Sequence, residues 1–255
     1  MKNESFVALL IIFISTLACK TPPNDKSDKE VIDENSEPQA QVTNTGEKQT
    51  FLQPDRFELA EPGPMIPPVP AIVLGVKGDS IIQDDITIVW TFVLEGTPPY
   101  IGISVPDNSA ITGDEYVALK LLEKHGEFTL NVPDGSWIKE FDQIDMTASS
   151  REDKFEANGL TRLPSKLIGA PGIAEAAIVL ECKVLQSHRL PPKRRVFFAE
   201  VVRTSVHPGV TDEDGRLISS SRDFFGMTSG NGEFWTFGKE IGHIGMTKGI
   251  EHIRY

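Results

Sequence analysis

The chain has 255 residues, a formal net charge of −12 and an isoelectric point near 4.9. This acidic balance argues against nucleic-acid binding, because contact with a phosphate backbone demands a basic face. Cys19 and Cys182 are the only cysteines in the sequence, so neither a disulfide framework nor a cysteine-rich metal site is expected.

The N-terminal residues have the pattern of an export signal. Lys2 precedes an apolar run, Phe6 to Ile14, that is shorter than the about 20 residues a membrane-spanning helix needs. The run leads into Ser-Thr-Leu-Ala-Cys at 15–19, which resembles a bacterial lipobox, although Thr16 stands where lipoboxes prefer leucine. We expect residues 1–18 to be a lipoprotein-type signal peptide and Cys19 to carry the lipid. The mature protein would then sit on the periplasmic or cell-surface side of a bacterial membrane. Ordinary secretion, with a chance cysteine at this position, is the alternative.

The next segment, 19–64, is predicted to be a tether with a proline-rich end. Residues 20–53 are polar and offer too little apolar surface to offset the entropy cost of ordering, so we expect disorder there. Prolines then cluster at 62–70, which predicts an extended stretch docked along the domain. The globular domain is expected to span 65–255.

Strand patterns dominate beyond residue 70. Runs rich in β-branched and aromatic residues predict strands at 71–76, 86–94, 100–105, 177–185 and 196–202. The connection at 190–193, Leu-Pro-Pro-Lys, predicts that the last two of these strands form a hairpin.

Helix signals are fewer. Thr112-Gly113-Asp114-Glu115 has the form of a capping box that opens a helix, which Gly126 would end. Weaker helices are predicted at 136–147 and 152–157. Many strands and few helices predict a mostly β fold, a β-barrel rather than alternating βαβ units.

Several kinds of chemistry are excluded by pattern. There is no phosphate-binding Gly-x-x-x-x-Gly-Lys-Ser/Thr loop and no Gly-x-Ser-x-Gly motif, and the Gly-Asn-Gly at 230–232 is interpreted as a turn. The five histidines lack metal-ligand spacing, and Cys182 is interpreted as a small core residue in a strand. We therefore nominate no catalytic side chain and no metal ligand. A cofactor enzyme needs neither, because the cofactor carries the chemistry.

A series of short motifs runs in order from residue 86 to residue 182. Their sequences are ITIVWT (86–91), PPYIGISV (98–105), SAIT (109–112), GEFTLNVP (126–133), DKF (153–155), APGIAEA (170–176) and LEC (180–182). In this order they resemble the flavin reductase-like, FMN-binding split β-barrel family, and its flavoredoxin-type members in particular. The resemblance covers Ala71 to Val201.

The resemblance implies an FMN site. The residues it assigns to the cofactor are Thr87, Val89, Trp90, Ser104, Val105, Ser109, Thr112, Asn131 and Lys154. Ser109 and Thr112 would take the phosphate and Lys154 would supply the positive charge. Elementary electrostatics supports this placement, because Thr112 heads the best-marked helix, whose free N–H groups and positive dipole end attract anions. The alternatives are a plain loop and capped helix at 109–112, barrel core at Trp90, and a strand end at Asn131.

Two departures from the family pattern bear on activity. Asp84 and Asp85 stand near a position that is often asparagine in the family, and a carboxylate beside a flavin disfavours the anionic reduced form. Arg194 stands where many reductase members have a histidine near the nicotinamide. It belongs to the basic cluster 193–195, which is either a solvated hairpin end or a contact for a nucleotide phosphate or an acidic redox partner.

The leading hypothesis from the sequence is an FMN-dependent oxidoreductase of the flavin reductase class, and the resemblance implies a homodimer. Electrons would pass from a reduced donor, with NAD(P)H a candidate, through bound flavin to free flavin, ferric iron or a protein acceptor. A non-enzymatic flavoprotein electron carrier tethered at the membrane is the second hypothesis, since cytosolic NAD(P)H is not available outside the inner membrane. A cofactor-free split-barrel binding lipoprotein is the third.

Overall fold

The computed structural model describes residues 61–66, 68–109, 113–149, 152–229 and 232–250. They belong to one unit of the chain, Glu58–Tyr255. The predicted signal peptide, the lipidation site Cys19 and the predicted phosphate ligand Thr112 lie outside the described residues, so these three remain predictions.

An antiparallel sheet of seven strands forms the body of this unit, in the order β3-β2-β6-β9-β10-β5-β4. Its strands are β2 (Val73–Val76), β3 (Asp85–Ile88), β4 (Trp90–Gly96), β5 (Pro99–Pro106), β6 (Glu127–Val132), β9 (Ile178–Leu190) and β10 (Arg194–Val206). Every pairing between neighbours is antiparallel. The mostly β prediction is confirmed.

The sheet curls on itself at Val89. Strands β3 and β4 lie at opposite edges of the sheet, yet only Val89 separates them in the chain. One residue spans at most about 3.6 Å, so the two edges must approach each other there and the sheet closes toward a barrel. The predicted continuous strand 86–94 is therefore wrong. Its two halves pair with different neighbours, while the Val89 side chain is buried and its N–H donates to the Ile72 carbonyl at 3.3 Å.

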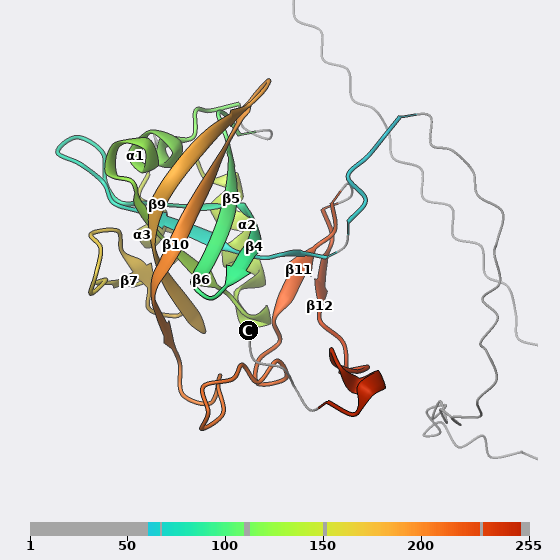
Figure 1. Ribbon diagram of the computed structural model, residues 1–255. Helices are drawn as coiled ribbons and strands as arrows, with labels where there is room; N and C mark the ends of the chain where they lie inside the picture. Colours follow the sequence, from blue (N-terminus) through green and yellow to red (C-terminus); the bar gives the residue numbers. More distant parts are fainter. Residues whose placement is uncertain (1–60, 67, 110–112, 150–151, 230–231, 251–255) are drawn as a thin grey trace, which may run out of the picture. The chain divides into compact units, whose positions relative to one another are not determined.

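The long β9–β10 hairpin runs across the sheet in Figure 1. It is the hairpin that the sequence predicts, although both strands continue several residues further, to Leu190 and from Arg194. Because β10 also pairs with β5, the start of β10 lies beside Ser104 and Val105. This pairing brings the basic cluster 193–195 close to the predicted cofactor residues.

In the part of the chain that the structure describes, three α-helices and two short 3₁₀ turns accompany the sheet. They are α1 (Val117–His125), α2 (Ile138–Met146), α3 (Lys154–Ala157), η1 (Gly135–Trp137) and η2 (Met246–Lys248). Helix α1 ends at Gly126 as predicted, with the left-handed conformation (φ 66°) that favours glycine. It buries Ala118, Leu121 and Leu122 in the barrel core.

The predicted capping box at the start of α1 is wrong. The helix begins at Val117, with Tyr116 at the N-cap and no side-chain cap. The segment before it folds back on itself instead: Ser109 N–H donates to the Asp114 carbonyl at 2.8 Å, and Tyr116 N–H donates to the Asp107 carbonyl at 2.9 Å. Because these backbone groups pair across a loop, no helical turn forms between 113 and 116.

A second core lies beside the barrel. It contains Phe141 of α2 packed edge-to-face against Phe225 and Phe234, with ring centroids 5.2 and 5.6 Å away. These rings come from a three-stranded sheet of β1 (Val69–Pro70), β11 (Phe225–Met227) and β12 (Phe234–Thr236), and β7 (Arg162–Leu163) pairs separately with β8 (Gly172–Ile173).

Cys182 lies in the barrel core and is fully buried. Burial raises the pKa of its thiol, and the adjacent charge of Glu181 raises it further. A thiol held protonated in this way is a poor nucleophile, so the interpretation of Cys182 as a core residue is supported.

Candidate functional site

A polar pocket opens where β3, the loop before α1 and the connection between α2 and α3 meet. Its lining residues are Thr87, Ser109, Asp114, Glu115, Tyr116, Asp145, Thr147, Ala148, Ser149 and Lys154. Its empty volume is about 270 Å³, including space open to solvent. Three of the residues that the sequence predicts for the cofactor, Thr87, Ser109 and Lys154, are brought together here from distant parts of the chain.

Thr87 presents an unsatisfied hydroxyl to this pocket. The residue is 1% exposed, and its Oγ1 has no hydrogen-bond partner within the described residues. The Tyr116 phenol is near enough to interact with it, but the geometry of a normal hydrogen bond is not met. Leaving a buried hydroxyl unpaired costs about 1–3 kcal/mol, so this group is a candidate partner for a bound ligand.

A buried ion pair forms the floor of the site. Lys154 Nζ lies 3.9 Å from Asp85 Oδ1, and the two residues are 5% and 3% exposed. Burial raises the pKa of Asp85 and lowers the pKa of Lys154, and in each case the opposite charge of the partner counteracts the shift. Asp85 Oδ1 accepts no hydrogen bond from any described residue. The pair is therefore held by charge rather than by hydrogen bonding.

Tyr116 and Asp145 form a second polar contact at the wall of the pocket. The Tyr116 hydroxyl donates to Asp145 Oδ1 at 3.2 Å. Burial, and then the Asp145 charge, raise the pKa of Tyr116 to about 12, so the phenol stays protonated. Burial also raises the pKa of Asp145.

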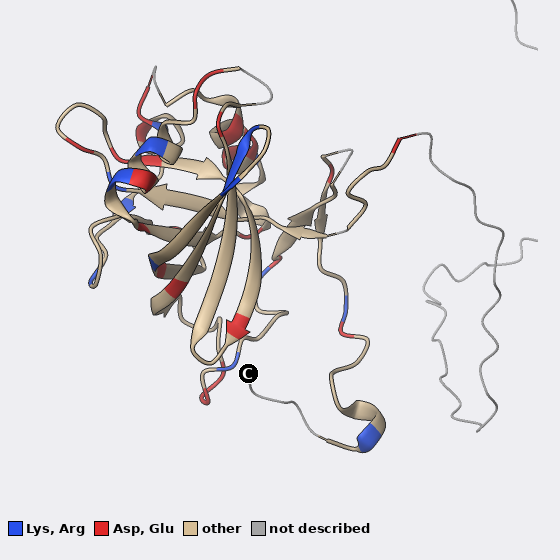
Figure 2. Cartoon of the chain, turned by 45° about the horizontal axis from the view of Figure 1, so that its top comes forward, with Lys and Arg blue, Asp and Glu red and all other residues tan. Residues whose placement is uncertain are grey.

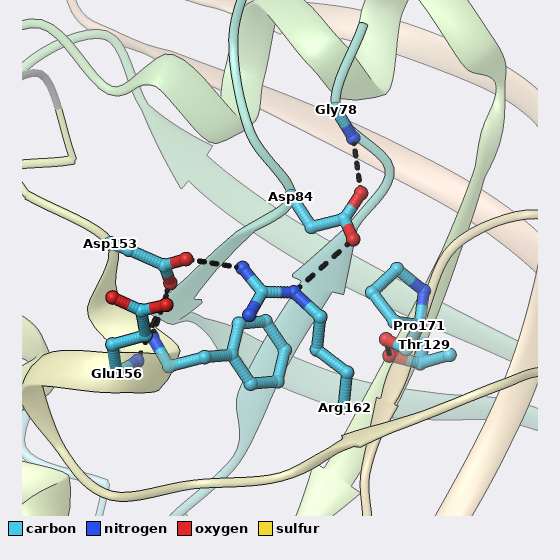
Figure 3. Close-up of polar contacts among 8 residues, drawn as sticks. Gly78, Asp84, Thr129, Asp153, Glu156, Arg162 and Pro171 are labelled. Carbon is cyan, nitrogen blue, oxygen red and sulfur yellow. Dashed lines mark hydrogen bonds and ion pairs between the residues drawn. The ribbon is translucent and has the colours of Figure 1, made fainter.

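Arg162 lies between Asp84 and Asp153 and pairs with both, as Figure 3 shows. Its guanidinium lies 2.7 Å from Asp153 Oδ2 and 3.4 Å from Asp84 Oδ2. Asp153 is the N-cap of α3, and its Oδ1 accepts the N–H of Phe155 at 2.9 Å. Asp84 and Asp153 each directly precede one member of the buried pair. The Arg162 clamp (Asp84, Arg162 and Asp153) therefore ties together the two backbone segments that carry the pair.

Arg194 and Trp90 form a flat wall next to the pocket. The Arg194 guanidinium stacks 4.3 Å from the Trp90 ring centroid. It also donates from Nε to Ser104 Oγ at 2.8 Å and from Nη2 to the Ser104 carbonyl at 2.9 Å. The charge of Arg194 acts on Tyr116, which links this wall to the pocket.

The basic cluster 193–195 is consequently not one solvated patch. Figure 2 shows Lys and Arg gathered near the tip of the β9–β10 hairpin. Arg194 turns onto Trp90, and Arg195 Nε pairs with Glu123 at 2.7 Å. Of the three cations, Lys193 remains exposed at the turn. The interpretation of the cluster as a solvated hairpin end is therefore wrong for Arg194.

Other predicted cofactor residues lie away from the pocket lining. The side chains of Val89 and Val105 are buried in the barrel core. Asn131 is also buried, and its amide is used inside the protein: Nδ2 donates to the Val73 carbonyl at 3.0 Å, and Oδ1 accepts the Ile173 N–H at 2.8 Å. For Val89 and Val105, only the backbone is left for contact with a ligand. The Asn131 amide instead connects β6 to β2 and β8 by hydrogen bonds.

Sequence reasoning missed Tyr116, Asp145 and Arg162. Tyr116 fell inside the predicted helix, where nothing set it apart from its neighbours. Asp145 lies next to buried Ile144 in α2, and an acid at that position is a weak signal of a buried contact. The role of Arg162 depends on three separate segments that meet only in the fold.

Two features were looked for in the described part of the chain and not found there. Within the described ranges, no group of three His, Cys, Asp or Glu residues is placed to hold a metal ion. In the same part of the chain, no helix is long and apolar enough to cross a membrane.

The fold and the pocket together define a class of protein, an antiparallel barrel with a polar pocket that Thr87 of β3 helps to line. The flavin reductase like domain model matches residues 68–227, and the chain belongs to this family. The resemblance seen in the sequence motifs is thus confirmed.

Individual proteins resemble this chain in sequence or in fold. An uncharacterized protein of Halalkalibacterium halodurans is 34% identical over 99 residues, which are 36% of this chain and 43% of that protein. The match spans less than half of that relative's length. Flavoredoxin of Desulfovibrio vulgaris (Miyazaki F) has a TM-score of 0.62 at 20% identity, over 73% of this chain and 96% of that chain. An FMN-binding protein from Thermus thermophilus has a TM-score of 0.56 at 20% identity, over 76% and 99%. These two structures show that the fold is shared.

Proposed function

We propose that this chain binds FMN without a covalent bond and acts as an oxidoreductase of the flavin reductase class. The observation that carries the proposal is the pocket in which Thr87, Ser109 and Lys154 meet, in a chain that belongs to the flavin reductase like family. The Thermus thermophilus neighbour is described as FMN-binding, which favours FMN, although FAD is a second candidate in this family.

The side chains of the pocket fit the polar part of a flavin. The Thr87 hydroxyl is buried and unsatisfied, and the Lys154 ammonium group reaches the same pocket. Hydroxyl groups of Ser109, Thr147 and Ser149 add donors and acceptors around it. Ribityl hydroxyls and ring carbonyls need such partners, and each one satisfied inside the pocket removes a desolvation cost.

The wall of Trp90 and Arg194 fits a flat, electron-rich ring. Trp90 is 40% exposed although it heads β4, so part of its face is open to a partner. Arg194 donates a hydrogen bond to Ser104 and stacks on Trp90. These two contacts hold its positively charged guanidinium in one place. A fixed cation beside the ring would offset the effect that we expect from Asp84 and Asp85.

Bound flavin would supply the redox chemistry, because it accepts and releases electrons in steps of one or two. The protein's own residues bind and orient. Thr87, Ser109 and Lys154 hold the polar end, and Trp90 shields the ring from water. No side chain is assigned as a general acid or base, since hydride transfer to a flavin needs none.

The electron donor and acceptor belong to the proposal. NAD(P)H is one donor, and free flavin, ferric iron or a redox protein is the acceptor. The lipobox-like N-terminus favours the second candidate function, a membrane-tethered flavoprotein electron carrier on the periplasmic or cell-surface side. In that case a protein partner reduces the bound flavin.

A homodimer is part of the proposal. Strand β4 lies at an edge of the sheet and exposes Phe92, Val93 and Leu94 at 42%, 79% and 45%. An apolar edge strand of this kind is a hazard for a monomer, and burial against a second copy removes it.

The deciding experiment is a spectrum of the purified full-length chain in detergent after incubation with FMN and removal of free ligand. Flavin absorption in the visible range, bleached anaerobically by NADH or NADPH, supports the oxidoreductase. Bleaching by a reduced protein partner but not by either nucleotide supports the carrier. A colourless protein that takes up no flavin would refute both and favour a cofactor-free binding module.

A further inference from the structure

An exposed apolar segment follows the part of the chain that matches the family. The family match stops at residue 227, and the C-terminal apolar segment, residues 235–250, begins in β12 and runs through η2. None of its residues is buried in the structure. Its exposed large apolar side chains are Trp235, Phe237, Ile241, Ile244, Met246 and Ile250.

This composition indicates that the C-terminal apolar segment contacts a further surface. Six of its sixteen residues are large and apolar, whereas segments that function fully solvated are poor in such residues. The most exposed of the six, Ile241, has 93% of its surface open to solvent. Large apolar side chains that gather on a surface mark contact sites for proteins or membranes.

The N-terminal part of the chain enters the domain beside this segment. Strand β1 pairs with β11, and β11 pairs with β12, so the three strands lie side by side. Just before β1, the Ile66 N–H donates to Ser229 Oγ at 3.2 Å, and Ser229 precedes β12. Figure 1 shows residues 61–66 next to these strands. The end of the predicted tether and the start of the C-terminal apolar segment therefore belong to one small sheet.

The charges and the tryptophan of the segment suit a phospholipid surface. Lys239 and Lys248 against Glu240 give it a formal charge of +1, in a chain whose formal charge is −12. Anionic lipids attract lysine side chains near the surface and repel an acidic protein elsewhere. Trp235 is 61% exposed, and tryptophan is enriched where a membrane meets water.

We propose that the C-terminal apolar segment lies in the headgroup region of the bilayer to which the N-terminus is predicted to be anchored. This contact holds the domain at the membrane at a second point. A short segment suffices, because a contact beside a covalent tether is intramolecular and needs only a modest affinity. The proposal rests on the predicted lipid anchor at Cys19 and is independent of flavin binding.

The test uses the full-length chain reconstituted in vesicles of phosphatidylethanolamine and phosphatidylglycerol, with plain or brominated acyl chains. Brominated lipid quenches the fluorescence of tryptophans that lie in the bilayer. The chain also contains Trp90 and Trp137, so the emission of Trp235 is taken as the part that Trp235→Phe removes. We expect brominated lipid to quench this part and iodide in the aqueous phase to leave it nearly unchanged.

Ile241→Glu tests the segment itself. We expect it to weaken the membrane contact by about tenfold or more, because burial of an isoleucine side chain is lost, and to reduce the quenching of Trp235 by brominated lipid. Ile81→Glu is the matched control. Ile81 is 90% exposed and lies between β2 and β3, so the same substitution there should leave the quenching unchanged.

Three results would overturn the inference and leave the lipid anchor standing. The first is a vesicle-bound chain whose Trp235 emission is quenched by iodide and not by brominated lipid. The second is Trp235 emission that neither reagent quenches, which indicates burial against a second copy of the chain. The third is equal quenching of Trp235 in Ile241→Glu and Ile81→Glu. A chain that separates from the vesicles in flotation would overturn the inference and the predicted anchor together.

Discussion

Replacement of Lys154 by methionine tests the buried ion pair under the pocket. The change keeps most of the side-chain volume and removes the charge, so Asp85 is left buried without a cation. Two unit charges 3.9 Å apart, the separation in the structure, attract by about 4 kcal/mol at an effective dielectric constant of about 20. Removing one member of a buried pair costs about 3–5 kcal/mol in general. We expect Lys154→Met to lower the free energy of unfolding by about 3–4 kcal/mol at pH 7.

The cost should depend on pH in a defined direction. Burial already raises the pKa of Asp85 in the folded state, and loss of Lys154 raises it further. A carboxyl whose folded pKa lies above its unfolded value favours the folded state when it is protonated, and it loses that advantage as pH rises through the folded pKa. The destabilisation by Lys154→Met is therefore full at neutral pH and shrinks as the pH falls.

Urea unfolding followed by circular dichroism at pH 7 and pH 5 measures both effects. Lys120→Met is the control, because its pair with Glu115 is 57% exposed on both sides and should contribute less than about 0.5 kcal/mol. The double variant Asp85→Asn with Lys154→Met should recover most of the loss. A cost below about 1 kcal/mol for Lys154→Met, or one that grows toward acid pH, would refute the reasoning.

Three further predictions concern the clamp, the pocket wall and the sheet edge. Arg162→Met should cost about 1–2 kcal/mol in urea unfolding because it breaks two ion pairs and a ring contact, whereas Arg216→Met, in exposed pairs, should cost less than about 0.5 kcal/mol. Equal losses of unfolding free energy for the two variants would contradict a stabilising role of the Arg162 clamp. Burial raises the folded pKa of Asp145, so Asp145→Asn should gain stability relative to the wild type as pH rises through that pKa and show little difference in acid. Thermal melts across pH measure this, and a gain confined to acid pH would contradict it. Val93→Lys should convert the proposed dimer to a monomer in sedimentation velocity, because it adds a charge to the exposed edge strand; an unchanged dimer would place the interface elsewhere.

Local patterns were sufficient for much of the fold. The strand predicted at 100–105, the Pro-Pro hairpin at 190–193 and the glycine end of α1 appear as predicted, and the strand predicted at 71–76 appears in its second part, Val73–Val76. Each depends on the preferences of a few adjacent residues, which a single sequence displays directly. The ordered motifs also identified the family, which the match to residues 68–227 confirms.

Other features depended on residues far apart in the chain. The break at Val89 arises because two edges of one sheet compete for the same segment, and the late start of α1 arises because the loop before it pairs with itself. The secondary-structure preferences of adjacent residues reveal neither of these two pairing choices.

In the candidate site, too, some features follow from the sequence and others only from the tertiary structure. The sequence by itself named Thr87, Ser109 and Lys154 and predicted their shared role, because the family motifs mark them. Only the tertiary structure decided what surrounds them. It placed Asp85 against Lys154 and turned Arg194 onto Trp90. The physical reason is that burial and charge pairing are properties of the assembled neighbourhood, in which a residue's partners come from strands and helices that lie far away in the chain.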